Sequence, residues 1–485
     1  MGVRLFFMPK IAIIGAGSAV FSRNVIADIL WHPALRDAEI TLMDIDVWRL
    51  EICGRMARSI NETLGARLTL RITTDLSEAL AGADFVICTM GVGGASATRL
   101  DLEIPLKLGL KQVIGDTLGV GGIFRAVRSV PVVLELCRLM EKICPNALLM
   151  NYANPMAMHM LAIHRASPVR AVGLCHGVVN TATTMRMLVA MKDVPAKDIE
   201  NHFRRPWRSA EREAEWKQWM TLGHDPDLSY TCAGINHMAA FLRFESGGRD
   251  LYPELRRLLD IPDFQAFEPV RFDLFRWLGY FLTETSGHCS EYVPYYLKDS
   301  AETDRCALRV AGYIETVRLL AQDVDRLDET LKSGAPVVPS EYSLSVEYAS
   351  RIINAVVTGT PFVFNGNVHN RGGALISNLP GDACVEVPCV ANRAGISPTF
   401  IGDLPPQVAA LIRTNINVQD LAVRGILESN KDFIYQAAML DPNTAASLTL
   451  PQIKSVVDAL FEAHGANLPA GYAFRGATRF DPIVP

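Results

Sequence analysis

A cysteine and a histidine stand side by side in the stretch GLCHGV, at Cys175 and His176. A cysteine beside an imidazole can ligate a metal ion, act as a redox thiol or attack a substrate as a nucleophile. Cysteine is also among the residue types most often buried for packing alone. The chemistry of this pair therefore depends on which other residues the fold brings to it.

A glycine turn near the start of the chain has the pattern of a nucleotide site. Gly15 and Gly17 lie between an apolar run and a segment of helix length, so a pyrophosphate could approach the backbone there, with the Ser18 hydroxyl beside it. Val20 stands where the usual fingerprint has a third glycine. Asp44 ends the next apolar run, where a carboxylate binds both ribose hydroxyls and repels a 2′-phosphate. The pattern predicts NAD rather than NADP.

The elements that must hold these residues alternate between short apolar runs and helical patterns over the first 175 residues. The runs predict strands that end in small, acidic or polar residues, at 10 to 17, 39 to 46, 84 to 91, 147 to 154 and 170 to 177. This alternation predicts an α/β fold with a Rossmann-like, doubly wound parallel sheet. Ligands of such sheets bind at the carboxyl ends of the strands, where GLCHGV lies.

The second part of the chain has a different pattern, which predicts an α+β domain. We expect strands at 229 to 244, 362 to 370 and 383 to 392, and helices at 301 to 330, 341 to 358 and 403 to 465. An insert at 201 to 219 holds three of the six tryptophans among dense charges. We therefore expect an NAD-binding domain over residues 1 to 178 and a substrate- and metal-binding domain over 179 to 485, with the active site at their interface.

Composition excludes several classes of function. The 485 residues carry a net charge of −5, with 20% charged and 49% hydrophobic residues, which leaves no basic surface of the kind that binds nucleic acid. Apolar runs are too short for a membrane span, and the N-terminal apolar stretch is too short for a signal peptide. The ten cysteines form no CxxC pair, so we expect free thiols in a reduced, cytoplasmic protein.

Segments along nearly the whole chain resemble the NAD- and metal-dependent glycosidases of glycoside hydrolase family 4, and in particular their α-galactosidase (melibiase) branch. The likeness rests on GAGSAVF (15 to 21), MDID (43 to 46), GDTLGVGGIFRAVRSVP (115 to 131), NYANPMAM (151 to 158), GLCHGV (173 to 178), CAGINHMA (232 to 239), GYFLTETSGHCSEYVPYY (279 to 296) and TNINVQ (414 to 419). The insert at 201 to 219 departs from the pattern. So does Gly177, where the melibiase version is expected to have serine.

The resemblance implies a reaction that needs no pair of catalytic carboxylates. In this family resident NAD oxidises the sugar at carbon 3, and a base then removes the acidified proton on carbon 2. The aglycone leaves by elimination, water adds, and the hydride returns to carbon 3. The substrate implied is a small sugar, with no nucleic acid or membrane partner, and the enzyme is expected to be a homodimer or homotetramer.

The resemblance also assigns roles to particular residues. It implies that Cys175 and His237 ligate a divalent ion, commonly Mn²⁺, and that Tyr292 removes the carbon 2 proton, in preference to Tyr295 and Tyr296. A single thiolate is unusual for Mn²⁺, because hard ions prefer oxygen ligands. A phenol has a pKa of about 10, so it needs a nearby cation to act as a base near neutral pH.

Further residues complete the expected site. Asn154 is expected to hold substrate hydroxyls, while Asp116 and Asp273 are candidate acids or carboxylates that tune the metal. His176 has two possible roles, which are to protonate the leaving oxygen or to orient the substrate.

Gly177 bears on the choice of sugar. In the family the residue after Cys-His follows the substrate, with serine in galactosidases, glutamate in glucosidases and glycine in hexuronidases. An anionic sugar would want a charged partner, for which Arg125, Arg128 and the arginines of 201 to 219 are candidates. Because most of the chain resembles the melibiases, we expect an α-galactosidase, with an α-galacturonidase or α-glucuronidase as the alternative.

Two proteins of other classes share part of the pattern. An NAD-dependent hydroxy-acid dehydrogenase would share the N-terminal sheet but would release NADH and would not need the metal pair or the tyrosine base. A redox-sensing nucleotide-binding protein would show no dependence on metal. These expectations distinguish both from a glycosidase.

Overall fold

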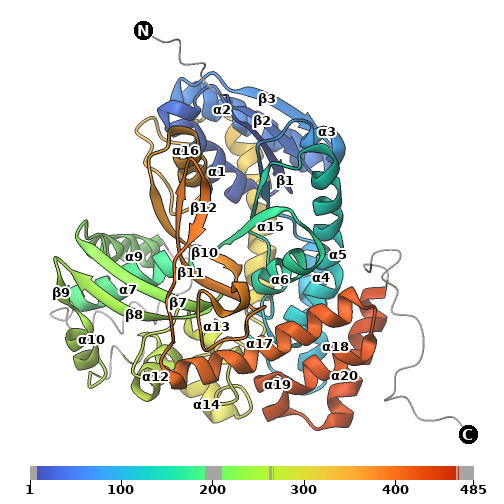
Figure 1. Cartoon of the computed structure of the whole chain (residues 1–485), viewed down its shortest axis with the longest axis vertical. Helices are drawn as coiled ribbons and strands as arrows, with labels where there is room; N and C mark the ends of the chain where they lie inside the picture. Colours follow the sequence, from blue (N-terminus) through green and yellow to red (C-terminus); the bar gives the residue numbers. More distant parts are fainter. Residues whose placement is uncertain (1–7, 192–209, 262–264, 266, 466–467, 469–485) are drawn as a thin grey trace, which may run out of the picture.

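The computed structural model describes residues 8–191, 210–261, 265, 267–465 and 468 of the chain. Within these residues, twelve strands form one sheet in the order β3-β2-β1-β4-β5-β6-β10-β11-β7-β8-β9, with β12 paired to β11. Figure 1 shows the sheet passing from the blue N-terminal strands through the orange β10 and β11 to the green β7–β9. Residues 201 to 209 of the predicted insert lie outside the described residues, and residues 210 to 219 are helical.

The N-terminal part of the sheet is parallel and confirms the expected Rossmann-like fold. Its strands are β1 (Lys10–Ile14), β2 (Glu39–Met43), β3 (Thr69–Thr73), β4 (Phe85–Cys88), β5 (Leu148–Asn151) and β6 (Arg170–Leu174). Their order 3-2-1-4-5-6 is that of dinucleotide-binding sheets. β3 was not predicted from the sequence, because this edge strand is largely exposed and lacks a continuous apolar run.

Local sequence explains why these elements begin and end where they do. β1 and β4 are almost entirely buried, as expected for parallel strands covered on both faces. The helix after β2 begins at the cap Asp46, whose side chain accepts a hydrogen bond from the amide of Arg49 at 3.1 Å. It ends at Gly65, which has a φ of 58°, a backbone conformation in which glycine is favoured.

Helices cover both faces of this sheet. In the first part of the chain they are α1 (Ala19–Trp31), α2 (Val47–Leu64), α3 (Leu76–Leu80), α4 (Gly94–Lys107), α5 (Gly119–Ile143), α6 (Met156–Ala166) and α7 (Gly177–Ala190), with the short η1 (Pro33–Leu35). The later helix α15 (Tyr313–Lys332) packs against α2 and α4, so the C-terminal part of the chain covers the N-terminal sheet.

The second part of the chain extends the same sheet with antiparallel strands. These are β7 (Leu228–Ile235), β8 (Met238–Ser246), β9 (Arg249–Asp250), β10 (Phe362–His369), β11 (Cys384–Asn392) and β12 (Gly395–Pro398). β10 pairs with β6, so the sheet is continuous across the boundary expected at residue 178, and the division into two domains stays a prediction. The single strand expected at 229 to 244 is wrong: it is the hairpin β7–β8.

Most of the remaining helices lie beside or below the second half of the sheet, whereas α16 packs against α1 and is drawn next to it (Figure 1). They are α9 (Ala210–Leu222), α10 (Tyr252–Leu258), α12 (Pro269–Leu278), α13 (Ser286–Glu291), α14 (Ser300–Arg305), α16 (Ala349–Thr358), α17 (Pro406–Leu427), α18 (Lys431–Leu440), α19 (Pro442–Ser447) and α20 (Leu450–His464), with the short η3 (Arg371–Gly373). The expected helix at 341 to 358 begins only at Ala349. No described helix has the length and apolar composition needed to cross a membrane.

Candidate active site

Cys175 lies at the carboxyl end of β6, directly before α7. All ten cysteines fall within the described residues, and nine are buried whereas Cys175 is half-buried. Burial, followed by the charges of Glu284 and Glu386, raises the pKa of the Cys175 thiol. A thiol with a raised pKa is a poor nucleophile in the absence of nearby positive charge.

His237 meets Cys175 from a distant part of the chain. It lies in the two-residue turn between β7 and β8, and its Nε2 is 3.4 Å from the Cys175 Sγ although the residues are 62 positions apart. The residue has a φ of 63°, a left-handed conformation that is costly for a side chain of this size. Burial lowers the pKa of His237 to about 4, which keeps the imidazole neutral, as a metal ligand must be.

Tyr292 is on the other side of the His237 ring. Its hydroxyl is 3.3 Å from His237 Nδ1, and the side chain is fully buried. Tyr295 is 53% exposed, whereas Tyr296 is also buried. Burial, followed by the charges of Asp116 and Glu291, raises the pKa of Tyr292 well above its usual value.

Asp116 and Asn154 connect to this cluster. Asn154 Nδ2 donates to Asp116 at 3.1 Å, and Arg125 Nε donates to the backbone carbonyl of Asn154 at 3.1 Å. The Thr117 hydroxyl donates to Asp116 at 2.7 Å and lies 3.2 Å from His237 Nδ1. Burial opposes ionisation of Asp116, but the charge of Arg125 and its other partners lower the pKa overall.

His176 pairs with Glu347, whereas its neighbour Cys175 contacts His237. Its Nδ1 is 3.0 Å from the Glu347 carboxylate, and its side chain is 48% exposed. The hydrogen bond to Glu347 raises the pKa of His176. Glu347 thus holds one ring nitrogen and leaves Nε2 available.

Three acidic or basic residues of the site were missed from the sequence, although all lie in the recognised segment 279 to 296. Glu284 Oε1 is 3.8 Å from Cys175 Sγ and 3.9 Å from His237 Nε2. His288 Nε2 is 3.9 Å from Asp116. Glu291 is buried and accepts from the amides of residues 113 to 115, which holds the loop that leads to Asp116. The signal was the density of ionisable residues in TETSGHCSEY.

Two expected residues are not brought to the cluster. Asp273 lies on α12, where its carboxylate pairs with Arg305 at 2.6 Å and is 34% exposed. Arg128 was a candidate anion contact, but it is fully buried in a two-pronged ion pair with Asp101, which His464 also contacts at 2.8 Å. Charged groups satisfied in this way serve the local structure, and the described contacts give neither residue a place beside Cys175 and His237.

The glycine turn brings the ends of three parallel strands close together. Gly15 has a φ of 86°, and a Cβ there would lie 2.9 Å from the backbone of residues 89 and 90, after β4. The Gly17 amide donates to Asp44 Oδ2 at 2.7 Å, so the acid expected to bind ribose is held beside the turn. Ser18 is exposed and makes no side-chain cap on α1, which leaves the amides of the first turn without that partner. A helix N-terminus of this kind suits a phosphate group.

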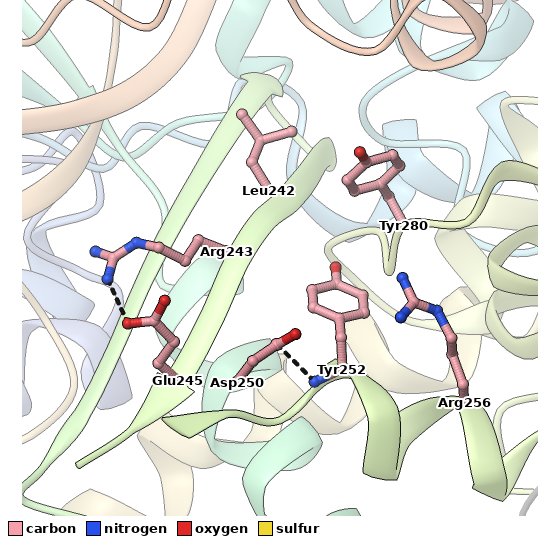
Figure 2. Close-up of a pocket in the computed structure, with 7 residues that line it drawn as sticks. All are labelled: Leu242, Arg243, Glu245, Asp250, Tyr252, Arg256 and Tyr280. Carbon is pink, nitrogen blue, oxygen red and sulfur yellow. Dashed lines mark hydrogen bonds and ion pairs between the residues drawn. The ribbon is translucent and has the colours of Figure 1, made fainter. Parts of the chain in front are cut away.

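A hollow of about 270 Å³ lies between β8 and α10, apart from the cluster around Cys175 and His237 (Figure 2). It is lined by Leu242, Arg243, Glu245, Asp250, Tyr252, Arg256 and Tyr280. Two of its acidic groups have partners, since Glu245 accepts from Arg243 at 2.7 Å and Asp250 accepts from the Tyr252 backbone amide at 2.9 Å. None of the residues expected to do chemistry lines this hollow.

The donor atoms around His237 fit a metal ion. Cys175, His237 and Glu284 each offer one ligand atom, and these atoms lie within 4.8 Å of one another. Asp116, His237 and His288 form a second such group, but Asp116 already accepts from Thr117 and Asn154. The first group combines a thiol, an imidazole and a carboxylate, a donor set that divalent transition ions accept.

Comparison with known families decides the class of this site. Residues 10–191 match the model of the family 4 glycosyl hydrolases, and residues 232–444 match that of their C-terminal domain. The chain is a family 4 glycosyl hydrolase. It is therefore a glycosidase, and neither a hydroxy-acid dehydrogenase nor a redox-sensing nucleotide-binding protein is needed to explain its N-terminal sheet.

Relatives of this glycosyl hydrolase act on several sugars. An α-galactosidase of Bacillus subtilis (strain 168) is 38% identical over 95% of this chain and 99% of its own length. An α-galacturonidase of Lachnoclostridium phytofermentans is 27% identical over 95% of this chain and 97% of its own length. A 6-phospho-α-glucosidase from gut microorganisms, solved in complex with NAD and Mn²⁺, has the same fold, with a TM-score of 0.74 and 20% identity over 96% of this chain and 99% of that one.

Proposed function

We propose that this family 4 glycosyl hydrolase cleaves α-galactosides and that it uses NAD and a divalent ion, Mn²⁺ in the first instance. The observation that carries the proposal is the meeting of Cys175, His237 and Tyr292 at the carboxyl end of β6. A metal-ligand pair next to a buried phenol suits proton removal beside a polarised sugar hydroxyl. The identity of 38% with an α-galactosidase supports the choice of substrate.

The cofactors are proposed from the residues and from the relatives together. Gly15, Gly17, Ser18 and Asp44 would hold NAD, and Cys175 with His237 would hold the ion. A relative of the same fold was solved with both NAD and Mn²⁺. When bound, NAD supplies a reversible hydride acceptor and the divalent ion supplies positive charge beside the sugar hydroxyls.

Tyr292 is the proposed base that takes the proton from carbon 2. Its hydroxyl is fixed against His237 Nδ1, and its backbone carbonyl accepts a hydrogen bond from Asn415 at 3.2 Å. Full burial keeps the phenol out of contact with bulk water. The surrounding carboxylates oppose ionisation of Tyr292, so this role requires positive charge nearby.

His176 and Asp116 are the proposed proton donor and organiser. Glu347 fixes His176 through Nδ1, which leaves Nε2 to face a leaving oxygen or a substrate hydroxyl. Asp116 orients Asn154 by accepting from its amide, and Arg125 holds the same residue by its backbone. Asn154 and Arg125 thereby form a fixed wall for sugar hydroxyls. Asp273 is not part of this proposal, because it is paired with Arg305.

The surroundings of Gly177 bear on which sugar the enzyme accepts. Gly177 has no side chain, but the carboxylate of Glu284 lies where a Cβ would be, at 1.5 Å from that position. Glu284 therefore fills the space that the missing side chain of Gly177 would leave open. The choice of an α-galactoside thus rests on the 38% identity with an α-galactosidase, and the α-galacturonidase remains the alternative.

The proposal is tested by comparing kcat/KM on nitrophenyl α-galactoside, α-glucoside and α-galacturonide, with NAD, Mn²⁺ and a thiol reductant present. We expect the galactoside to exceed the others by at least tenfold, which is about 1.4 kcal/mol of transition-state preference. A tenfold advantage for the uronide would instead establish the alternative. We further propose a cytoplasmic homodimer or homotetramer with two domains, which light scattering and limited proteolysis would test.

A further inference from the structure

We propose that Glu284 is a third protein ligand of the divalent ion and that residue 177 is glycine so that this carboxylate can reach it. The inference rests on the metal site proposed above and adds a residue to it. It concerns two positions that lie on different elements, before α13 and at the start of α7.

Backbone pairing brings Glu284 to His237. Thr283 bonds the backbone of Ala239 in both directions, with its amide donating at 2.8 Å and its hydroxyl accepting at 3.0 Å. Ala239 is two residues after His237 on β8. The side chain of Glu284 therefore projects beside the β7–β8 turn, where it is 14% exposed.

The distances between the three donor atoms are those of ligands around one ion. Cys175 Sγ and His237 Nε2 are 3.4 Å apart, and Glu284 Oε1 is 3.8 Å from the sulfur and 3.9 Å from the nitrogen. Two atoms bonded to one ion at about 2.0 to 2.3 Å lie roughly 3 to 4 Å apart. The other oxygen of Glu284 faces His288, at 3.9 Å.

The backbone of residue 177 does not require glycine. Gly177 is the first residue of α7 and has no left-handed φ. Its backbone conformation is therefore open to alanine, which has a higher helix propensity than glycine. What a side chain would meet is the Glu284 carboxylate, 1.5 Å from an ideal Cβ, with the Cys175 sulfur at 3.4 Å. The glycine is therefore explained by the space that Glu284 occupies.

Backbone strain marks the same residues. His237 and Glu284 have φ values of 63° and 70°, in the left-handed region that is unfavourable for residues other than glycine. Such conformations are kept where the surrounding structure fixes them for a function. Here both turn a donor atom toward Cys175.

Ligand chemistry gives the carboxylate a purpose. Thiolate and imidazole alone suit softer ions, whereas Mn²⁺ prefers oxygen. Glu284 supplies an oxygen from the protein and a second negative charge. This would hold the ion before the sugar arrives.

The test measures Mn²⁺ affinity directly, by electron paramagnetic resonance titration of the full-length enzyme with NAD present and without substrate. We expect Glu284→Gln, which keeps the shape, to lower the affinity at least tenfold. Gly177→Ala should lower it to a similar extent, because the new methyl group displaces the carboxylate. The Mn²⁺ affinity of the double variant should lie within about twofold of that of Glu284→Gln, because both substitutions remove the same interaction.

Two matched controls separate this effect from general ones. Glu302→Gln removes a charge on exposed α14, and Gly465→Ala adds a methyl group where no atom lies within 4 Å. Both should bind Mn²⁺ as the wild type does. Unchanged affinity in Glu284→Gln, or effects of the two site changes that multiply, would overturn the inference while leaving the proposed function standing. A wild-type enzyme that binds no Mn²⁺ would overturn the proposed metal site as well.

Discussion

The glycine turn and the metal cluster are built in opposite ways. The turn comes from the ends of neighbouring parallel strands, and its contacts are made largely by backbone, as where the Gly17 amide donates to Asp44. The cluster is made of side chains from three separate places, at the end of β6, in the β7–β8 turn and before α13. A site built from local backbone needs little support from elsewhere, whereas a site of distant side chains depends on the whole sheet.

This difference predicts that the two regions can be damaged separately. The contacts of Asp44 involve the turn and α2, and the contacts of Cys175 involve His237, Glu284 and Gly177. These sets share no residue. Loss of NAD binding and loss of metal binding should therefore be independent.

The largest effect is expected from Cys175→Ala. Removing the thiolate ligand should lower kcat/KM by at least about 1,000-fold, or roughly 4 kcal/mol, because the ion is lost from the reacting centre. NAD affinity, measured by fluorescence titration, should stay within about twofold of the wild type. Cys144→Ala, at the end of α5, is the control and should keep its activity. A variant that loses both activity and NAD would show that the two regions are coupled.

A somewhat smaller effect is expected from Tyr292→Phe. Loss of a general base costs roughly 100- to 10,000-fold, so kcat should fall by at least about 100-fold while NAD and Mn²⁺ still bind. Tyr295→Phe, at an exposed tyrosine three residues away, should be nearly neutral. Wild-type turnover in heavy water should place deuterium on carbon 2 of the product, as mass spectrometry would detect. Equal rates for both phenylalanine variants would place the base elsewhere.

Asp44→Ala should weaken the binding of NAD at the glycine turn and leave the binding of Mn²⁺ unchanged. A charge-assisted hydrogen bond is worth about 1.5 to 3 kcal/mol, so NAD affinity should fall by about tenfold or more. Mn²⁺ affinity should not change, because Asp44 has no contact with Cys175 or His237 among the described residues. Calorimetric titration of each cofactor would measure both. An equal fall in the two affinities would contradict the separation.

The smallest effect on activity is expected from Arg128→Met, which belongs to neither region. It breaks a fully buried ion pair with Asp101, so the free energy of unfolding should fall by about 3 to 5 kcal/mol. The turnover of the folded enzyme should be nearly unchanged, because the pair joins α4, α5 and α20 away from Cys175. Urea denaturation would give the first quantity and kinetics at low temperature the second. A changed KM with unchanged stability would restore the anion-binding role expected from the sequence.

The sequence was sufficient for the parallel sheet and for the turn, because both leave local patterns. Apolar runs identified β1, β2, β4, β5 and β6, and only the exposed edge strand β3 escaped. It was not sufficient for the antiparallel extension, since the pairing of β6 with β10 joins residues nearly 200 positions apart and leaves no local signal. The β7–β8 turn was not predicted, because His237 takes the left-handed position at which glycine usually marks a hairpin turn.

The site shows the same limit residue by residue. The resemblance predicted Cys175, His237 and Tyr292, and the structure places His237 within hydrogen-bond distance of each of the other two. Glu284 and His288 were passed over, although they lie in the same segment as Tyr292, because only their three-dimensional neighbours distinguish them. Asp273 was predicted as a site carboxylate, but in the structure it pairs with Arg305.

The most direct test of the account is to follow nitrophenol release and NADH absorbance together, in enzyme stripped of NAD and treated with a chelator. Activity on nitrophenyl α-galactoside should be absent, should return only when both NAD and Mn²⁺ are added, and should proceed through many turnovers without net NADH. This result would show that both regions serve one hydrolytic reaction. Full activity in the stripped enzyme, or one NADH formed for each sugar consumed, would contradict it.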